Sequence, residues 1–253
     1  MLRFFRKTRK KLLENNKVTK YLLYATGEII LIVIGILIAL AINNWSINDQ
    51  NRQQEQFYLK ALKTEFITSQ LKLEKLIEVN KLNYENAKEI AVFITSEEAP
   101  SEQELSKLIY EALAYNISYN PNNSVLNELI NTGGLKVITS ESLRLRLTSW
   151  ESFIESVHKQ EETLNEQRER VLEVFRREGS IRTGLDEAGV TKEIGLSPSP
   201  QPSSNLELLS STPFENELLL LILNGVITEK EHFLPLREEI QKILTLIDQE
   251  IED

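Results

Sequence analysis

The sequence predicts an all-α protein in which one N-terminal transmembrane helix is followed by an extracytoplasmic antiparallel bundle of about four main helices. Three observations lead to this fold class. Residues 21–42 form a nearly uninterrupted apolar run. A basic arm precedes that run, and an acidic remainder follows it. Most of the remainder carries apolar residues at the three-to-four-residue spacing of amphipathic helices.

Residues 21–42 are long enough and apolar enough to form the transmembrane helix. As a helix rising about 1.5 Å per residue they reach about 33 Å, and a hydrocarbon core is about 30 Å thick. Eleven Ile, Leu and Val residues lie between Ile29 and Ile42. They favour insertion by about 5 kcal/mol, whereas an ionised Glu28 costs at most about 3 kcal/mol. Insertion is therefore expected. Aromatic residues typical of membrane interfaces flank the run, namely Tyr21, Tyr24 and Trp45.

The charge distribution predicts the orientation of this helix. Residues 1–20, the basic arm, contain eight Lys or Arg residues and one acidic residue, although the net charge of the whole chain is −9. Because positively charged flanks stay in the cytoplasm, we expect a cytoplasmic N terminus, an inner-membrane location and a periplasmic C-terminal domain. The strongest part of this positive-inside signal is Arg3, Arg6, Lys7, Arg9, Lys10 and Lys11. A cleaved signal peptide is the alternative, since Ala39-Leu40-Ala41 has the form of a cleavage site.

The N-terminal stretch "FFRKTRKKLLENNKVTKYLLYATGEIILIVIGILIALAINNW" closely resembles the start of a family of small Bacteroidota membrane proteins, the domain of unknown function 6090. In that family an FFRKxR-like arm leads into a YxxGEIxLxxIGILIALxINNW-like anchor. A second stretch, "LNELINTGGLKVITSESLRLRLTSW" at 126–150, is similar to another recurring patch of the family. The resemblance implies a single-pass topology and supplies no reaction. The matching anchor residues are Tyr24, Gly27, Glu28, Gly35, Ile36, Leu37, Ile38, Ala39, Leu40, Asn43, Asn44 and Trp45.

Glu28 shares one stripe of the predicted transmembrane helix with Gly35, Ala39 and Ile42, because these positions are separated by seven, four and three residues. Gly35 and Ala39 form a small-x-x-x-small pair that lets two helices approach closely. Three interpretations of Glu28 stay open. Its side chain reaches the headgroups or the basic arm, it donates a hydrogen bond between associated helices, or it carries protons.

The region after the anchor reads as helical. A polar stalk, 43–56, leads into residues 57–178, the first part of the bundle. The apolar repeat in 57–94 is interrupted by Ser69, Asn80 and Asn83. Ser101-x-x-Glu104 is a capping box that opens a helix to about Ile117. Two further helices are expected at Ser124–Asn131, which ends at a glycine pair, and at about Ser140–Glu178.

Residues 179–212 differ in composition from the rest of the body. They include "SPSPQPSS", and we expect a Pro/Gly/Ser-rich loop or linker. Pro213 suits a helix N terminus, and residues 213–253 complete the same bundle, with a bend at Asn224-Gly225. The stalk helix, residues 46–75, is expected to pack against copies of itself, which predicts a homo-oligomer containing coiled-coil contacts.

No catalytic set is evident. The chain has no cysteine and two histidines, and no Gly-rich phosphate loop follows a strand. One coincidence points to a metal: Glu155-x-x-His158 and Glu229-x-x-His232 resemble half of a di-metal carboxylate site in a four-helix bundle. Glu65 and Glu128 are the carboxylates that would complete it. However, His158 and His232 each follow or precede a core position and are expected on the surface.

We therefore expect a non-enzymatic scaffold, sensor or partner-binding protein of the cell envelope, without a cofactor. Its expected partners are the lipid bilayer, copies of itself and another envelope protein. Nucleic acid is not expected, because phosphate binding needs a dense Lys/Arg surface. An ion-coupled, stator-like subunit that uses Glu28 is the alternative function, and a di-metal carboxylate enzyme is the second alternative.

Overall fold

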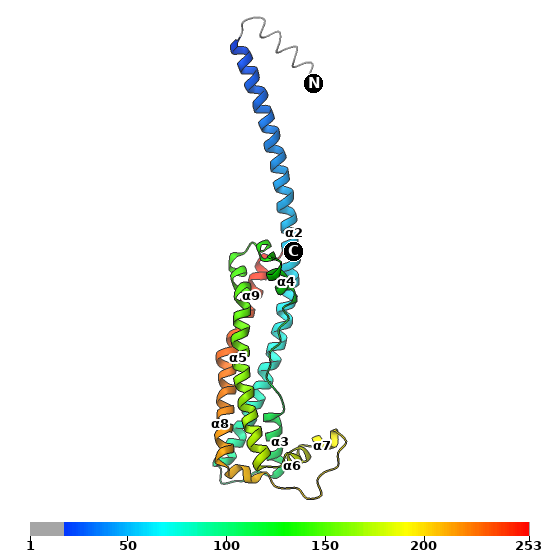
Figure 1. Ribbon diagram of the computed structural model, residues 1–253, viewed down its shortest axis with the longest axis vertical. Helices are drawn as coiled ribbons and strands as arrows, with labels where there is room; N and C mark the ends of the chain where they lie inside the picture. Colours follow the sequence, from blue (N-terminus) through cyan, green and yellow to red (C-terminus); the bar gives the residue numbers. More distant parts are fainter. Residues whose placement is uncertain (1–17, 253) are drawn as a thin grey trace. The chain divides into compact units, whose positions relative to one another are not determined.

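The structure, a computed structural model, describes residues 18–252 (Figure 1). Side chains are described from residue 22 onward. The described residues contain helices and no strand, so the all-α class is confirmed for this part of the chain. The predicted positive-inside residues lie outside the described residues, as does the side chain of Tyr21. The chain divides into two compact units, Met1–Glu55 and Gln56–Asp253, and each is described by itself. Residues 56–252 are called the helical body below.

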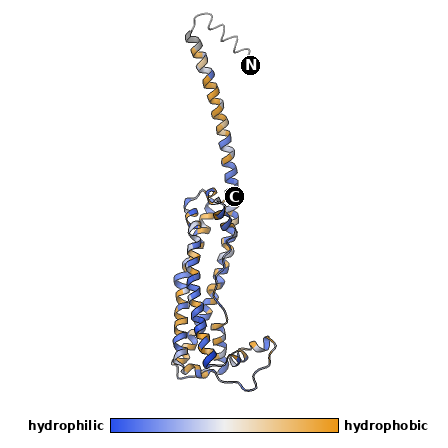
Figure 2. Cartoon of the chain, in the orientation of Figure 1, coloured by the Kyte–Doolittle hydropathy of each residue, from blue (hydrophilic) through white to orange (hydrophobic). Residues whose placement is uncertain are grey.

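The longest element is α2, Val18–Thr95. Its first part includes the predicted transmembrane helix, and the chain stays helical through the predicted polar stalk. From Leu22 onward, α2 is the one described helix that is long and apolar enough to cross a membrane. Figure 2 shows the apolar residues concentrated in this first part of the helix.

In the helical body, the second part of α2 is followed by α3 (Glu102–Leu113), α4 (Ser124–Asn131), η1 (Gly134–Val137) and α5 (Glu141–Glu178). The Ser101 hydroxyl caps α3 by accepting a hydrogen bond from the Glu104 N–H at 3.1 Å. After α4 the chain turns at Gly133, whose φ of 68° favours glycine. The predicted bounds of α4 and α5 match the structure closely.

The C-terminal half begins with three short helices, α6 (Ile181–Glu187), α7 (Val190–Glu193) and η2 (Leu206–Ser210). It continues through α8 (Thr212–Ile227), a π-helical turn, η3 (Thr228–Phe233), and α9 (Leu234–Glu250). The core lies where α5 packs against α8 and α9 and where the Phe66 ring of α2 meets Trp150 edge to face, with ring centroids 4.9 Å apart. Apolar burial of this kind supplies most of the stability of such a body.

Two expectations need correction. The helix that Ser101 opens ends at Leu113 rather than near Ile117, because Ile117 and Tyr119 are buried in a non-helical segment. Residues 179–212, expected as a plain loop or linker, contain α6, α7 and η2. The buried Asn205 ties this region together. Its Oδ1 accepts from the Ser180 N–H at 2.7 Å, and its own N–H donates to Glu102 Oε1 at 2.9 Å.

Candidate functional site: an apolar span and a clamped segment

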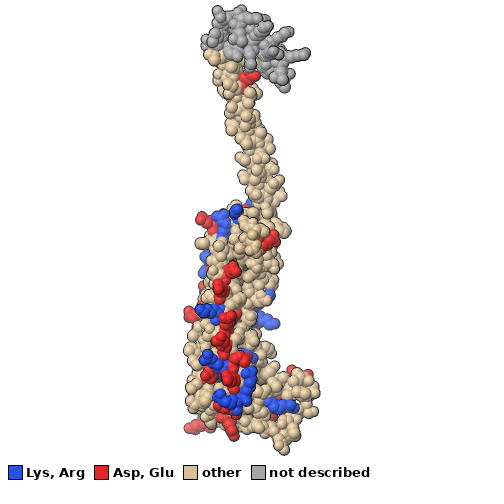
Figure 3. Space-filling model, in the orientation of Figure 1, with Lys and Arg blue, Asp and Glu red and all other residues tan. Residues whose placement is uncertain are grey.

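Residues 22–45 of α2 are called the apolar span, and all of them except Tyr24, Ala25 and Glu28 are exposed. Leu23 and Leu31 are each 74% exposed and Trp45 is 71% exposed, and no part of the most apolar stretch is buried. Figure 3 shows that charged side chains gather on the helical body and that the first part of α2 is nearly free of them. Exposed aliphatic side chains in an unbroken row are costly in water and favourable in lipid.

The predicted stripe of the apolar span is open. Glu28 and Tyr24 are half-buried, whereas Gly35 and Ala39 are exposed. A Cβ atom placed on Gly35 would have no described atom within 4 Å. The backbone of the span is therefore accessible at Gly35, as a close helix–helix approach requires. Self-association through this face stays a prediction.

The residues nominated for a metal site do not assemble into one. Among the described residues, no group of three His, Asp or Glu side chains is arranged to hold a metal ion. His158 Nε2 lies 3.0 Å from the Tyr119 carbonyl oxygen, and Glu229 accepts a hydrogen bond from the Tyr84 hydroxyl at 2.7 Å. Glu155 is exposed, and burial lowers the pKa of the half-buried His232. Each nominated bundle carboxylate has its own contact: Glu65 with the start of α4 and Glu128 with Tyr58.

The most elaborate polar arrangement of the helical body surrounds residues 115–123, between α3 and α4. These residues are called the clamped segment. On its α5 side, Asn165 holds the backbone of Ile117 twice, accepting from its N–H at 3.1 Å and donating to its carbonyl at 2.7 Å. Glu161 accepts from the Tyr119 N–H at 2.8 Å. Together with His158, which contacts the Tyr119 carbonyl, these α5 side chains are hydrogen-bond partners for the backbone groups of both Ile117 and Tyr119.

On the α2 side, three side chains hold the same segment. Asn83 donates to the Tyr115 carbonyl at 3.2 Å, and Lys72 donates to the Asn120 carbonyl at 3.0 Å. The Ser69 hydroxyl accepts from the Asn122 N–H at 2.9 Å. An unpaired buried polar group costs about 1–3 kcal/mol. The backbone of the clamped segment needs partners, and this need explains why polar residues interrupt the apolar repeat of α2.

Glu65 fixes the end of the clamped segment. Its two carboxylate oxygens accept from the backbone N–H groups of Val125 and Leu126, at 2.8 and 3.1 Å. These N–H groups belong to the first turn of α4, where a negative charge also meets the positive end of the helix dipole. Glu65 therefore acts as an N-cap supplied by another helix.

Burial dominates the electrostatics of the clamp. It raises the pKa of Glu161, while the hydrogen bond from Tyr119 and the neighbouring His158 act in the opposite direction. Burial likewise raises the pKa of the Tyr119 hydroxyl, which donates to the Ser69 carbonyl at 3.0 Å. Ser69, Asn83 and Glu161 are buried, and the clamp is thus a partly buried polar network in which backbone atoms take most of the hydrogen bonds.

Two open grooves flank the clamped segment. One, of about 390 Å³, lies between the segment and α2 and is lined by Lys72, Lys75, Leu76 and Val79 together with segment residues. The other, of about 550 Å³, lies beside α5. It is acidic and is lined by Asn116, Glu162, Asn165, Glu166, Glu169 and Arg170. The segment therefore presents surfaces of opposite charge on its two sides.

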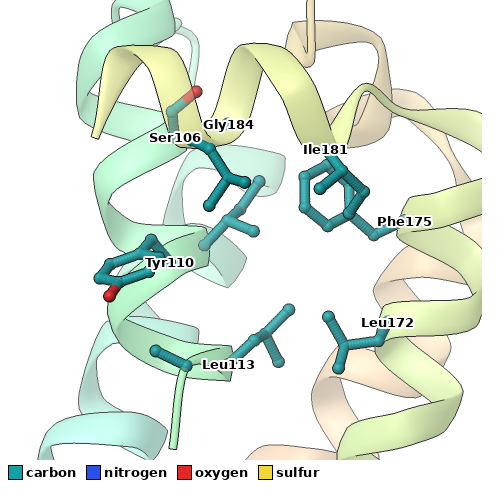
Figure 4. A pocket seen from close by; sticks show the side chains of 10 residues that line it. Ser106, Tyr110, Leu113, Leu172, Phe175, Ile181 and Gly184 are labelled. Atoms are coloured by element: carbon teal, nitrogen blue, oxygen red, sulfur yellow. The ribbon is translucent and has the colours of Figure 1, made fainter. Parts of the chain in front are cut away.

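A separate apolar pocket of about 180 Å³ lies between α3, the end of α5 and α6. In Figure 4, Tyr110 and Leu113 of α3 face Leu172 and Phe175 of α5 across it. The Ser106 hydroxyl at its edge is buried and has no hydrogen-bond partner among the described residues. Binding pockets for drug-sized ligands have about 300–1,000 Å³, so this pocket suits only a small apolar group.

The sequence reasoning missed the clamp but contained a signal for it. Ser69 and Asn83 interrupt the apolar repeat of α2, and both contact the clamped segment. A polar residue at a core position usually has a specific partner, so these interruptions could have pointed to a non-helical neighbour.

Comparisons with known proteins add one match. The model of a family described as "Family of unknown function (DUF6090)" matches residues 28–172. This range includes most of the apolar span, the clamped segment and the part of α5 that holds it. No curated protein and no solved structure matches the chain.

Proposed function

The chain belongs to DUF6090, a family of unknown function, and we propose that it is a single-pass protein of the inner membrane whose helical body binds a partner in the cell envelope. The observation that carries the proposal is the apolar span. Its side chains are exposed from Ile29 to Trp45, and lipid is the solvent that accommodates such a helix. The basic arm supports a cytoplasmic N terminus and a periplasmic body.

The helical body supports a binding role rather than a catalytic one. It has a closed apolar core, and the clamp devotes buried polar side chains to holding one segment at the surface beside two grooves. A sequence without cysteine and with two histidines offers few of the usual nucleophiles and bases. We therefore assign the body the role of a non-enzymatic scaffold or sensor that contacts another envelope protein.

We also assign a self-association role to the apolar span. Small residues at an exposed face allow two helices to approach closely in lipid, and Gly35 and Ala39 supply such a face.

Glu28 favours a second candidate function, an ion-coupled membrane subunit. An acidic residue inside a strongly apolar segment is a candidate functional residue by default. Glu28→Gln separates the two functions. If the phenotype of a deletion strain is complemented fully by the Gln variant, proton transfer through Glu28 is excluded.

The test of the leading proposal is site-specific photo-crosslinking in intact cells. A photoreactive residue placed at the exposed Leu145 or Asn116 of the body should give adducts with a specific envelope protein, and the same residue at buried Leu147 should give none. Adducts with cytoplasmic proteins alone would contradict the proposal, because they would place the body on the other side of the membrane.

A further inference from the structure

The clamped segment has the alternation of a β-strand. Ile117 and Tyr119 are buried, whereas Asn116, Ser118 and Asn120 are exposed. In an extended chain, the N–H and C=O of one residue point to the same side, and successive residues point to opposite sides. The backbone groups of Ile117 and Tyr119 point to α5, where Asn165, Glu161 and His158 bind them.

In an extended segment the alternate residues direct their backbone groups to the opposite side, and the Asn120 carbonyl accordingly accepts from Lys72 of α2. Within residues 18–252, the backbone N–H and C=O groups of Asn116 and Ser118 make no hydrogen bond. Both residues line the 390 Å³ groove, so the segment offers unpaired backbone groups there, as the edge of a strand does. An open edge of this kind is a template for another extended chain.

The wall of the groove opposite this edge is apolar with a basic rim. Leu76 and Val79 of α2 are half-buried and contact the core with their inner sides. Lys75 is exposed and makes no ion pair within the described part of the chain. Lys72 already binds the Asn120 carbonyl and Asn122. The groove thus offers two backbone hydrogen-bonding residues, an apolar surface and one available positive charge.

We propose that this groove binds an extended acidic peptide of an envelope partner by strand addition to the edge at Asn116 and Ser118. The inference rests on the proposed function, because it names where the body binds its partner. Backbone hydrogen bonds supply affinity, an apolar side chain of the peptide packs on Leu76 and Val79, and a peptide carboxylate pairs with Lys75. Two lysines in an acidic body do not suit nucleic acid, which needs a dense basic surface.

The test uses the full-length protein in nanodiscs and a fluorescein-labelled Val-Glu-Val-Glu-Val peptide, followed by fluorescence anisotropy. We expect saturable binding. A Val-Lys-Val-Lys-Val peptide and a backbone N-methylated copy of the acidic peptide should each bind about tenfold more weakly, because one loses the charge match and the other loses the backbone donors. Equal binding of all three peptides, or no binding of the acidic one, would overturn the proposal.

Two variants locate the site. Lys75→Glu should weaken binding of the acidic peptide about tenfold, whereas Lys81→Glu, an equally exposed change on α2 outside the groove, should not. Ser118→Pro removes the open N–H and should weaken binding without a change in unfolding midpoint. If that variant is destabilised, the N-methylated peptide tests the same hydrogen bonds. Loss of binding in both lysine variants alike would contradict a site in this groove.

The peptide-binding test and the photo-crosslinking test of the proposed function can fail independently of each other. If photo-crosslinking through Leu145 captures an envelope protein while the acidic peptide fails to bind, the groove is not the site and the binding role of the body stands. If the peptide binds in the groove but the body lies in the cytoplasm, the periplasmic role fails and the groove proposal stands.

Discussion

Asn165 shows at the residue scale how the helical body positions its surface. One amide side chain satisfies both backbone groups of Ile117, and the Ile117 side chain is then buried against the core. Ser69, Asn83 and Glu161 act in the same manner on neighbouring residues. These polar side chains therefore fix one backbone conformation of the clamped segment. Apolar side chains at the same positions would not select a single conformation.

Asn165→Ala should lower the free energy of unfolding by about 2 kcal/mol, because two hydrogen bonds are lost and both Ile117 groups depend on water that reaches them imperfectly. Urea unfolding of the detergent-solubilised protein, followed by circular dichroism, measures the change. Glu162→Ala, an exposed neighbour on α5, is the control and should change stability by less than about 0.5 kcal/mol. Equal effects of the two substitutions would show that the clamp is not a stabilising contact.

Glu161 predicts a pH dependence. Burial raises its folded-state pKa above the ordinary value of 4.5. The protonated carboxyl is thus favoured in the folded state. Its contribution to stability is complete below the unfolded pKa and is lost as pH rises through the folded pKa. The stability of the natural protein minus that of Glu161→Gln should therefore fall as pH rises above the ordinary carboxyl pKa of 4.5.

The matched control for this prediction is Glu162→Gln, whose stability difference from the natural protein should change little over the same range. Urea unfolding at several pH values gives both curves. A difference for Glu161→Gln that grows with pH would mean that the carboxylate is stabilised rather than penalised in the folded state.

At the scale of elements, the approach of α8 to α2 depends on a glycine. A Cβ atom on Gly225 would lie 2.8 Å from the Tyr84 Cβ, and the Gly225 carbonyl accepts from the Asn80 amide at 2.9 Å. Tyr84 in turn donates to Glu229 in the π-helical turn. Where the sequence predicts a bend, at Asn224-Gly225, the structure has a close helix–helix contact that is followed by a π-helical turn.

Gly225→Ala should destabilise the body by about 1–2 kcal/mol. Overpacking costs about 1–3 kcal/mol and outweighs the gain of about 1 kcal/mol in helix propensity. Leu223→Ala, whose side chain is 54% exposed on the same helix, is the control and should cost less. Thermal unfolding by circular dichroism compares them. A Gly225→Ala protein that is more stable than the natural one would show that α8 and α2 can move apart freely.

Element by element, the sequence predicted most helices because their apolar spacing and caps are local signals. The start of α3 follows from Ser101, and the end of α4 follows from the glycine pair at Gly133. The end of α3 was placed too late because Ile117 continues its apolar pattern. Tertiary contacts determine where α3 ends, because the clamped segment that follows it is held by side chains of α2 and α5. The local sequence pattern does not reveal these partners.

The region 179–212 was also harder to predict, for a similar reason. Its Pro-Ser composition favours a loop, yet the buried Asn205 links Ser180 and Glu102 across large distances in the sequence. Part of the candidate site was hard to predict for the same reason, because its contacts join residues that are far apart in the sequence. The apolar span could be predicted residue by residue, whereas the clamp depends on three separate elements meeting at one place.

At the scale of the whole molecule, the account depends on the apolar span. The insertion free energy of its aliphatic residues exceeds the cost of Glu28 by about 2 kcal/mol. The natural protein and Glu28→Gln should therefore both remain in the membrane pellet after carbonate extraction. Replacing both Ile32 and Leu37 by Lys should release the chain, because each Lys near mid-bilayer costs about 3 kcal/mol. Retention of the double-lysine variant would show that membrane association does not depend on the span.

The topology of the chain tests the central claim most directly, and the natural absence of cysteine makes the measurement clean. Thr8→Cys and Glu193→Cys place single thiols in the basic arm and in α7 of the helical body. Spheroplasts with intact inner membranes are treated with a membrane-impermeant maleimide. We predict that the thiol at 193 is labelled directly and that the thiol at 8 is labelled only after the membrane is broken. The reverse pattern, or a mature chain that lacks residue 8, would contradict a single-pass protein with a periplasmic body.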